Sequence, residues 1–126
     1  MKNKKKTYPI RARDFRALCK AYNSQKRWLY ALQKEHDLLI KEGCKGDPER
    51  IRIEERMAVQ IRLLQENLVK TEEILEKVEE CCGEEAADTL RQVYIERIPQ
   101  KTAASHLGIS ERTLQRRIRT WLEEVL

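Results

Sequence analysis

The sequence is poor in aromatic residues, which make up 6% of its 126 positions, whereas charged residues make up 37%. This composition favours long, solvent-exposed helices over a thick globular core. No apolar run approaches the roughly 20 residues of a membrane-spanning helix, so we expect no membrane partner. The first residues also lack the apolar stretch of a signal peptide, which favours a cytoplasmic protein.

The four cysteines form no CxxC pair, and both histidines lie far from them in the sequence. Zinc sites use closer ligand spacings, so we expect reduced thiols and no bound metal. The chain also has no glycine-rich phosphate loop, no carboxylate pair placed beside a base in a loop, and no Cys/His arrangement of catalytic spacing. We therefore expect neither enzymatic activity nor a cofactor.

The net charge of +5 is unevenly distributed along the chain. Residues 1–6 and the C-terminal third are basic, whereas residues 72–88 are acidic. A uniform excess would indicate only solubility, but this separation indicates that the basic end meets a polyanion. The acidic segment is either a solvated helix face or a surface for a basic partner such as RNA polymerase.

Two long heptad patterns predict an antiparallel helical hairpin over residues 14–82. The tail before it, residues 1–13, is basic and expected to be flexible. Asp14 is the expected N-cap of the first helix, and Pro48 the expected first residue of the second after a cap at Asp47. The first seam consists of Phe15, Leu18, Tyr22, Gln25, Leu29, Leu32, His36 and Leu39. The second consists of Met57, Ile61, Leu64, Leu68, Thr71, Leu75 and Val78.

Several large apolar residues of the hairpin lie outside both seams, namely Trp28, Tyr30, Ile40, Ile53 and Ile74. Two helices alone would leave apolar edges exposed, and a self-associating four-helix arrangement would bury these residues. We therefore expect a homodimer. The alternative is that the hairpin folds back on the C-terminal helices of its own chain.

Residues 83–126 predict a three-helix unit whose last two helices form a helix-turn-helix. A support helix follows Gly83, with Ala87, Leu90, Val93, Tyr94 and Ile98 on its buried side. The turn is expected at Gly108, which tolerates positive φ, and Ser110 is the expected N-cap of the last helix. The core of the motif is expected to consist of Ala103, Ala104, Leu107, Gly108, Ile109, Leu114 and Ile118, completed by Trp121 or Leu122.

A basic stripe on the opposite side of this last helix predicts binding to double-stranded DNA. We expect the helix over residues 110–122 to enter the major groove, where arginine reads guanine and glutamine reads adenine. The expected base contacts are Arg112, Gln115 and Arg116. The expected phosphate contacts are Lys101, Thr113, Arg117 and Arg119. A solvated basic helix that binds nothing is the alternative.

The segment 90–96 (LRQVYIE), followed by AASHLGISERTLQRRI, resembles region four of sigma factors. It resembles still more closely the phage late-gene transcription activators of the RinA and ArpU type. The resemblance covers about the last 40 residues, judged by motif order. It implies a phage or prophage transcription regulator that acts on DNA in the cytoplasm of a bacterial host, at the nucleoid, through a sigma-like domain over residues 83–126. The frame from Thr102 to Gly108 departs from the family in lacking an acid beside its alanine.

Two other functions remain open. A phage small-terminase-like subunit also joins a helix-turn-helix to oligomerising helices, but it acts by delivering DNA to a packaging motor. A helical scaffold whose basic end binds no DNA is the third reading. If the protein is a regulator, the hairpin either forms the dimer or recruits RNA polymerase.

Overall fold

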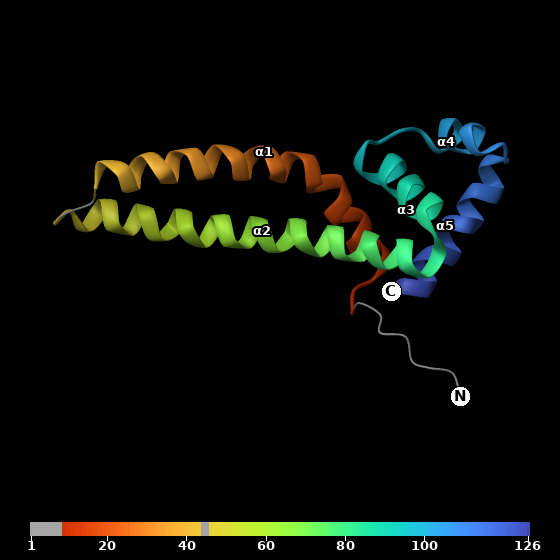
Figure 1. The fold of residues 1–126 in the computed structure, drawn as a ribbon, viewed down its shortest axis with the longest axis horizontal. Helices are drawn as coiled ribbons and strands as arrows, with labels where there is room; N and C mark the ends of the chain where they lie inside the picture. Colours follow the sequence, from red (N-terminus) through yellow and green to blue (C-terminus); the bar gives the residue numbers. More distant parts are fainter. Residues whose placement is uncertain (1–8, 44–45) are drawn as a thin grey trace.

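The computed structural model describes residues 9–43 and 46–126, in which all regular structure is helical (Figure 1). The elements are α1 (Ala12–Glu42), α2 (Pro48–Cys82), α3 (Glu84–Leu90), a π-helical turn η1 (Arg91–Ile95), α4 (Gln100–Leu107) and α5 (Glu111–Val125). The predicted all-α fold and the long antiparallel pair of α1 and α2 are confirmed. Most of the predicted tail (residues 1–8) and Cys44 lie outside the described residues.

The start of α1 differs from the prediction that Asp14 is the N-cap. The helix begins at Ala12, so Asp14 stands in its first turn, and its carboxylate accepts from the Arg11 backbone N–H at 3.5 Å. A carboxylate in the first turn still interacts favourably with the positive end of the helix dipole. Asp14 therefore stabilises the same helix end from inside the helix.

The turn between α1 and α2 follows the sequence signals closely. Gly43 ends α1 at φ 86°, a conformation that glycine adopts without steric cost. The Asp47 carboxylate caps α2 by accepting from the backbone N–H groups of Glu49 at 3.1 Å and Arg50 at 3.4 Å. Pro48 occupies the first helical position, where its missing N–H costs nothing.

The two predicted seams face each other along the pair and are buried or half-buried at every position. At about 1.5 Å per residue, helices of 31 and 35 residues run for about 50 Å. His36 is half-buried in the seam, as predicted, and its Nε2 has no hydrogen-bond partner among the described residues. We call residues 23–43 and 46–70, the part of the pair that extends away from the other helices, the arm.

The hydrophobic core lies at the opposite end of the pair, where α3, η1 and α5 pack against it and α4 packs on α5 (Figure 1). The beginning of α1 contributes Phe15 and Cys19, which are fully buried, and the end of α2 contributes Ile74, Leu75 and Val78. One cluster joins these residues to the C-terminal helices, so the base of the hairpin folds against its own chain. We call this end, which consists of residues 9–22 and 71–126, the head.

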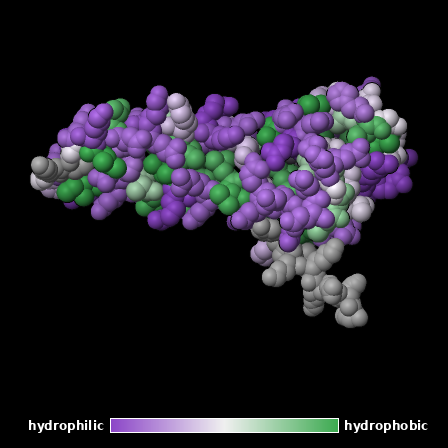
Figure 2. Space-filling model, viewed as in Figure 1, coloured by the Kyte–Doolittle hydropathy of each residue, from purple (hydrophilic) through white to green (hydrophobic). Residues whose placement is uncertain are grey.

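The off-seam residues divide between the arm and the head. Ile74 is fully buried in the head of its own chain, so it does not need the self-association that the sequence predicts for its burial. Trp28, Tyr30, Ile40 and Ile53 are exposed. All nine large hydrophobic residues that are exposed among the described residues lie in the arm, and Figure 2 shows apolar groups interspersed with polar ones along it.

The support segment is more irregular than the predicted single helix. After α3 the chain widens into the π-helical turn η1, in which the Glu96 N–H donates to the carbonyl of Arg91, five residues back, at 2.9 Å. The turn brings both Val93 and Ile95 into the core and leaves Tyr94 and Ile98 half-buried. Arg97, at φ 61°, then redirects the chain toward α4.

A polar cluster at the root of the arm ties the hairpin to the head. The Tyr22 hydroxyl donates to the Glu72 carboxylate, and Arg91 forms an ion pair with the same carboxylate at 2.9 Å. The Arg91 hydrogen bond holds the pKa of Glu72 below its ordinary value of 4.5, against the opposing effect of desolvation. Nearby, the Asn23 amide donates to the carbonyl of Ile95 at 3.3 Å. These contacts join η1 to α1 and α2 at the place where the arm begins.

The substitution Glu72→Gln should lower the free energy of unfolding by about 1 kcal/mol at neutral pH, since the pair is partly solvent-exposed. A lowered folded-state pKa contributes stability above the ordinary pKa, and this contribution is lost as pH falls through the folded pKa. The difference from wild type, measured in urea titrations, should therefore shrink as pH falls below 4.5. Glu76→Gln, at an exposed position one turn further along α2, is the matched control. Equal stability of the two variants at neutral pH would contradict a stabilising role for the contacts of Glu72.

Candidate nucleic-acid interface

The short helix α4 presents small residues to the rest of the head. Ala103 and Ala104 are almost completely buried, and Leu107 is half-buried. Small side chains let neighbouring helix backbones approach closely, and α4 packs chiefly on α5. Lys101 lies on the exposed side of α4. The apolar residues of α4 therefore face the rest of the head.

The turn between α4 and α5 is closed by backbone hydrogen bonds around Gly108. Gly108 has φ 70° and ψ 29°, the left-handed conformation that residues with a Cβ adopt only at a cost. Its N–H donates to the carbonyl of Ser105 at 3.1 Å, and that of Ile109 donates to the carbonyl of Ala104 at 3.0 Å. This pair of bonds is a Schellman motif, which ends a helix sharply.

Ser110 caps the start of α5, as predicted. Its hydroxyl oxygen accepts from the backbone N–H of Thr113 at 3.1 Å, and its hydroxyl group donates to the Thr113 side-chain oxygen at 2.9 Å. Thr113 is half-buried, and neither of these two bonds uses its own hydroxyl hydrogen. The cap and Gly108 together make α5 a separate helix that leaves the turn in a new direction (Figure 1).

The two sides of α5 differ in character. Leu114, Ile118, Leu122 and Val125 are buried against the core, at three- and four-residue intervals. The other side carries Arg112, Gln115, Arg116, Arg117 and Arg119, all exposed, which we call the basic face. Within the part of the chain that the structure describes, none of these four guanidinium groups is ion-paired to a carboxylate. Their charges are therefore available to an external anion.

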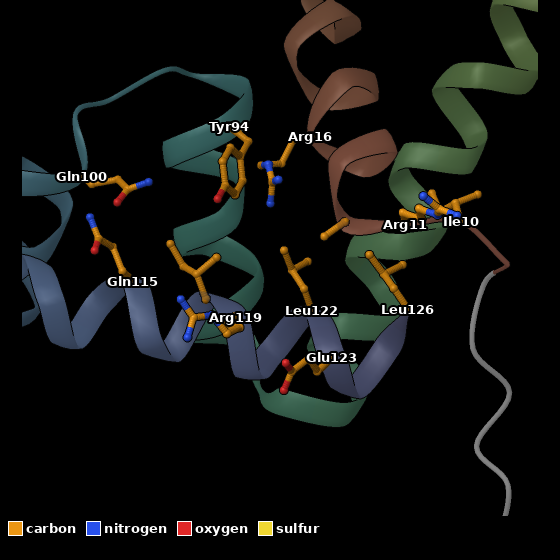
Figure 3. Close-up of a pocket in the computed structure, with 12 residues that line it drawn as sticks. Ile10, Arg11, Arg16, Tyr94, Gln100, Gln115, Arg119, Leu122, Glu123 and Leu126 are labelled. Carbon is orange, nitrogen blue, oxygen red and sulfur yellow. The ribbon is translucent and has the colours of Figure 1, made fainter.

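The members of the basic face do not all face the same way. Gln115 and Arg119 lie on one flank of α5, where they line a cavity of about 620 Å³ together with residues of α1, η1 and α4 (Figure 3). Arg116, Arg117 and Thr113 border a second cavity of about 420 Å³ beside the end of α2 and α3. Arg112 lines neither cavity. The predicted contact residues of α5 thus lie along both flanks of its exposed side.

Sequence reasoning missed the contribution of α1 to this region. Arg11 and Arg16, which precede α5 by about a hundred positions, share the larger cavity with Arg119 and Gln115. Gln100, at the first position of α4, lies there as well. No local pattern marks these residues, because only the packing of the head brings α1 beside α5.

Metal ligands, a reactive thiol or a membrane-spanning helix among the described residues would suggest a different function. They contain no group of three or more His, Cys, Asp or Glu residues that could hold a metal ion. Burial raises the pKa of the Cys19 thiol to about 12, so it is protonated at neutral pH and is a poor nucleophile. None of the helices in residues 9–43 and 46–126 is long and apolar enough to cross a bilayer.

Comparison with known proteins adds no family to this description. No protein-family model matches the chain, and neither a curated protein nor a solved structure matches it.

Proposed function

We propose that this protein is a sequence-specific regulator of transcription, of phage or prophage type, which binds double-stranded DNA. The observation that carries the proposal is the basic face of α5, whose arginines are exposed and lack carboxylate partners among the described residues. The turn at Gly108 and the buried apolar side of α5 support it, because they hold this helix in one fixed orientation. The proposal includes no catalytic activity.

In this proposal α4 and α5 form a helix-turn-helix, with α5 in the major groove. A helix fits the width of that groove, where arginine can bind guanine through two hydrogen bonds and glutamine can do so with adenine. Arg112, Gln115 and Arg116 stand in the first half of α5 and would contact base edges. Lys101, Thr113, Arg117 and Arg119 lie around them and would hold phosphates.

The order of the elements also supports the proposed sigma-like domain. The segment α3–η1 packs against α2 and α4, and α4 packs against α5, so three helical segments share one core. This is the order that the resemblance to region four of sigma factors implies. It supports a regulator that works beside RNA polymerase.

We further propose that the arm mediates self-association into a dimer. Monomeric proteins rarely expose extended apolar surface, yet nine large hydrophobic residues are exposed in the arm. The most exposed of them are Tyr30 at 64% and Leu38 at 58%. Burial of these residues in a second copy would leave the two heads free to bind two half-sites at a fixed spacing. A polymerase surface that covers the same residues is the alternative partner.

The same observation favours a second function, that of a DNA-recognition subunit in viral packaging. Exposed apolar residues along a helical arm would also allow assembly into a closed ring, which delivers DNA to a motor. The two functions differ in the number of copies that the arm brings together, since a regulator needs two and a packaging ring needs many more.

The substitution Arg116→Ala tests the recognition of bases by α5. A binding selection with randomised duplex oligonucleotides first supplies the preferred site. On that site the variant should lose about 1–3 kcal/mol of binding free energy, because a two-bond contact to a base is lost. On random duplex DNA it should lose much less, in a titration followed by fluorescence anisotropy.

Arg62→Ala is the matched control, since Arg62 is an exposed arginine of the arm. It should bind both DNAs like the wild type. An equal loss on selected and random DNA in Arg116→Ala would show that Arg116 does not read bases.

Solution mass, measured by light scattering after gel filtration, tests the proposed role of the arm. The wild type should be a dimer, and the double variant Trp28→Gln, Leu63→Gln should be a monomer, because both positions are exposed apolar residues of the arm. Arg62→Gln, beside Leu63, should remain a dimer. A ring of about eight or more subunits would instead favour the packaging function, and a wild-type monomer would contradict self-association.

A further inference from the structure

The larger cavity of the head lies between the beginning of α1, the π-helical turn η1 and the C-terminal half of α5 (Figure 3). Its volume of about 620 Å³ falls within the range of pockets that hold small organic molecules, roughly 300–1,000 Å³. A contact with one DNA phosphate would not require a hollow of this size. The cavity is therefore a candidate site for a ligand other than DNA.

One part of the cavity is lined by hydrogen-bond donors. Figure 3 shows Tyr94 between Gln100 and Arg16, and Arg119 of α5 lines the same cavity. Burial raises the pKa of Tyr94, against the opposing effect of Arg16, so its hydroxyl remains a donor at neutral pH. Within the described residues neither Arg16 nor Arg119 is ion-paired to a carboxylate. Two guanidinium groups and a phenol provide the donors that an anionic oxygen group requires.

The remaining part of the cavity is apolar. Ile10 and Ala12 line it from the start of α1, and Leu122 and Leu126 line it from the end of α5. The only acidic residue on the lining is Glu123, whose carboxylate points away from Tyr94 and Gln100 (Figure 3). An inorganic ion would leave this apolar surface in contact with water, whereas an organic acid would cover it with its own apolar body.

We propose that this cavity binds a small organic acid, in which one anionic group is attached to an apolar ring or branched chain. The anionic group binds Arg16 and Arg119, and the apolar body lies against Leu122 and Leu126. Because Arg119 and Gln115 belong also to the basic face, an occupied cavity competes with DNA for these two side chains. The competition with DNA, which is the regulatory part of the proposal, rests on the proposed function, whereas the binding of the acid itself does not.

The binding test uses 8-anilinonaphthalene-1-sulfonate as the anionic probe and N-phenyl-1-naphthylamine as its uncharged counterpart, both followed by fluorescence. The full-length protein should bind the anion at one saturable site. Arg16→Gln should weaken this binding about tenfold and leave the uncharged probe unaffected, since a hydrogen bond to a charged group is lost. Ala12→Leu, which fills part of the apolar region, should weaken both probes.

Arg13→Gln is the matched control, because Arg13 is exposed in the same turns of α1 and does not line the cavity. It should bind both probes like the wild type. Equal affinity for the anionic probe in Arg16→Gln and Arg13→Gln would overturn the proposal. Tighter binding of the uncharged probe than of the anionic one by the wild type would also overturn it.

The regulatory part is tested by titrating duplex DNA with and without the anionic probe. The probe should lower the affinity of the wild type for DNA, and Arg16→Gln should lose most of this effect. Unchanged DNA affinity at saturating probe would overturn the competition and leave the ligand site standing.

If Arg16→Gln weakens DNA binding in the absence of any probe, the anion held at Arg16 is a DNA phosphate, and the small-molecule site is overturned. If the wild type binds no DNA, the proposed function fails, but the fluorescence result still decides whether the cavity binds an acid.

Discussion

The orientation of α5 depends on the burial of its apolar side. Leu114, Ile118 and Leu122 are at most 4% exposed and join the core formed by the ends of α1 and α2. Burying side chains of this size stabilises the head by roughly 1.5–3 kcal/mol each. Once these residues are inside, the helical period leaves Arg112 and Arg116 no position except the surface. The exposed charge that we propose to bind DNA is thus a consequence of how the core is packed.

The arm depends on the same core, because its two helices begin and end inside the head. Phe15 and Val78 are fully buried there, and the cluster of Tyr22, Glu72 and Arg91 closes the junction. Beyond this junction the pair is held by its seam and, at its far end, by the ion pair of Arg50 with Glu42 at 2.8 Å. Its outer apolar residues are exposed. The molecule therefore joins a packed head to an arm whose outer apolar residues are exposed. In the proposed dimer the head binds DNA and the arm mediates self-association.

Features that depend on neighbouring residues could be predicted from the sequence. The cap at Asp47, the left-handed Gly108 and the two sides of α5 each follow from a few adjacent positions. Features that depend on tertiary packing could not. Ile74 has no local signal for burial, and the π-helical turn that buries Ile95 has none either. Arg16 and Arg119, far apart in the sequence, line one cavity only because of how the head is packed. Asp14 was misplaced because aspartate suits both the N-cap and the first turn of a helix.

The salt dependence of binding to duplex DNA tests the central claim, that the basic face docks on DNA, most directly. Each neutralised phosphate contributes about −0.9 to the slope of log affinity against log salt concentration, so three basic phosphate contacts predict a slope of about −3 or steeper. Lys101→Gln should make this slope shallower by about 1, because one of these contacts is removed. Binding that is absent, or that does not change between roughly 50 and 200 mM salt, would contradict the account.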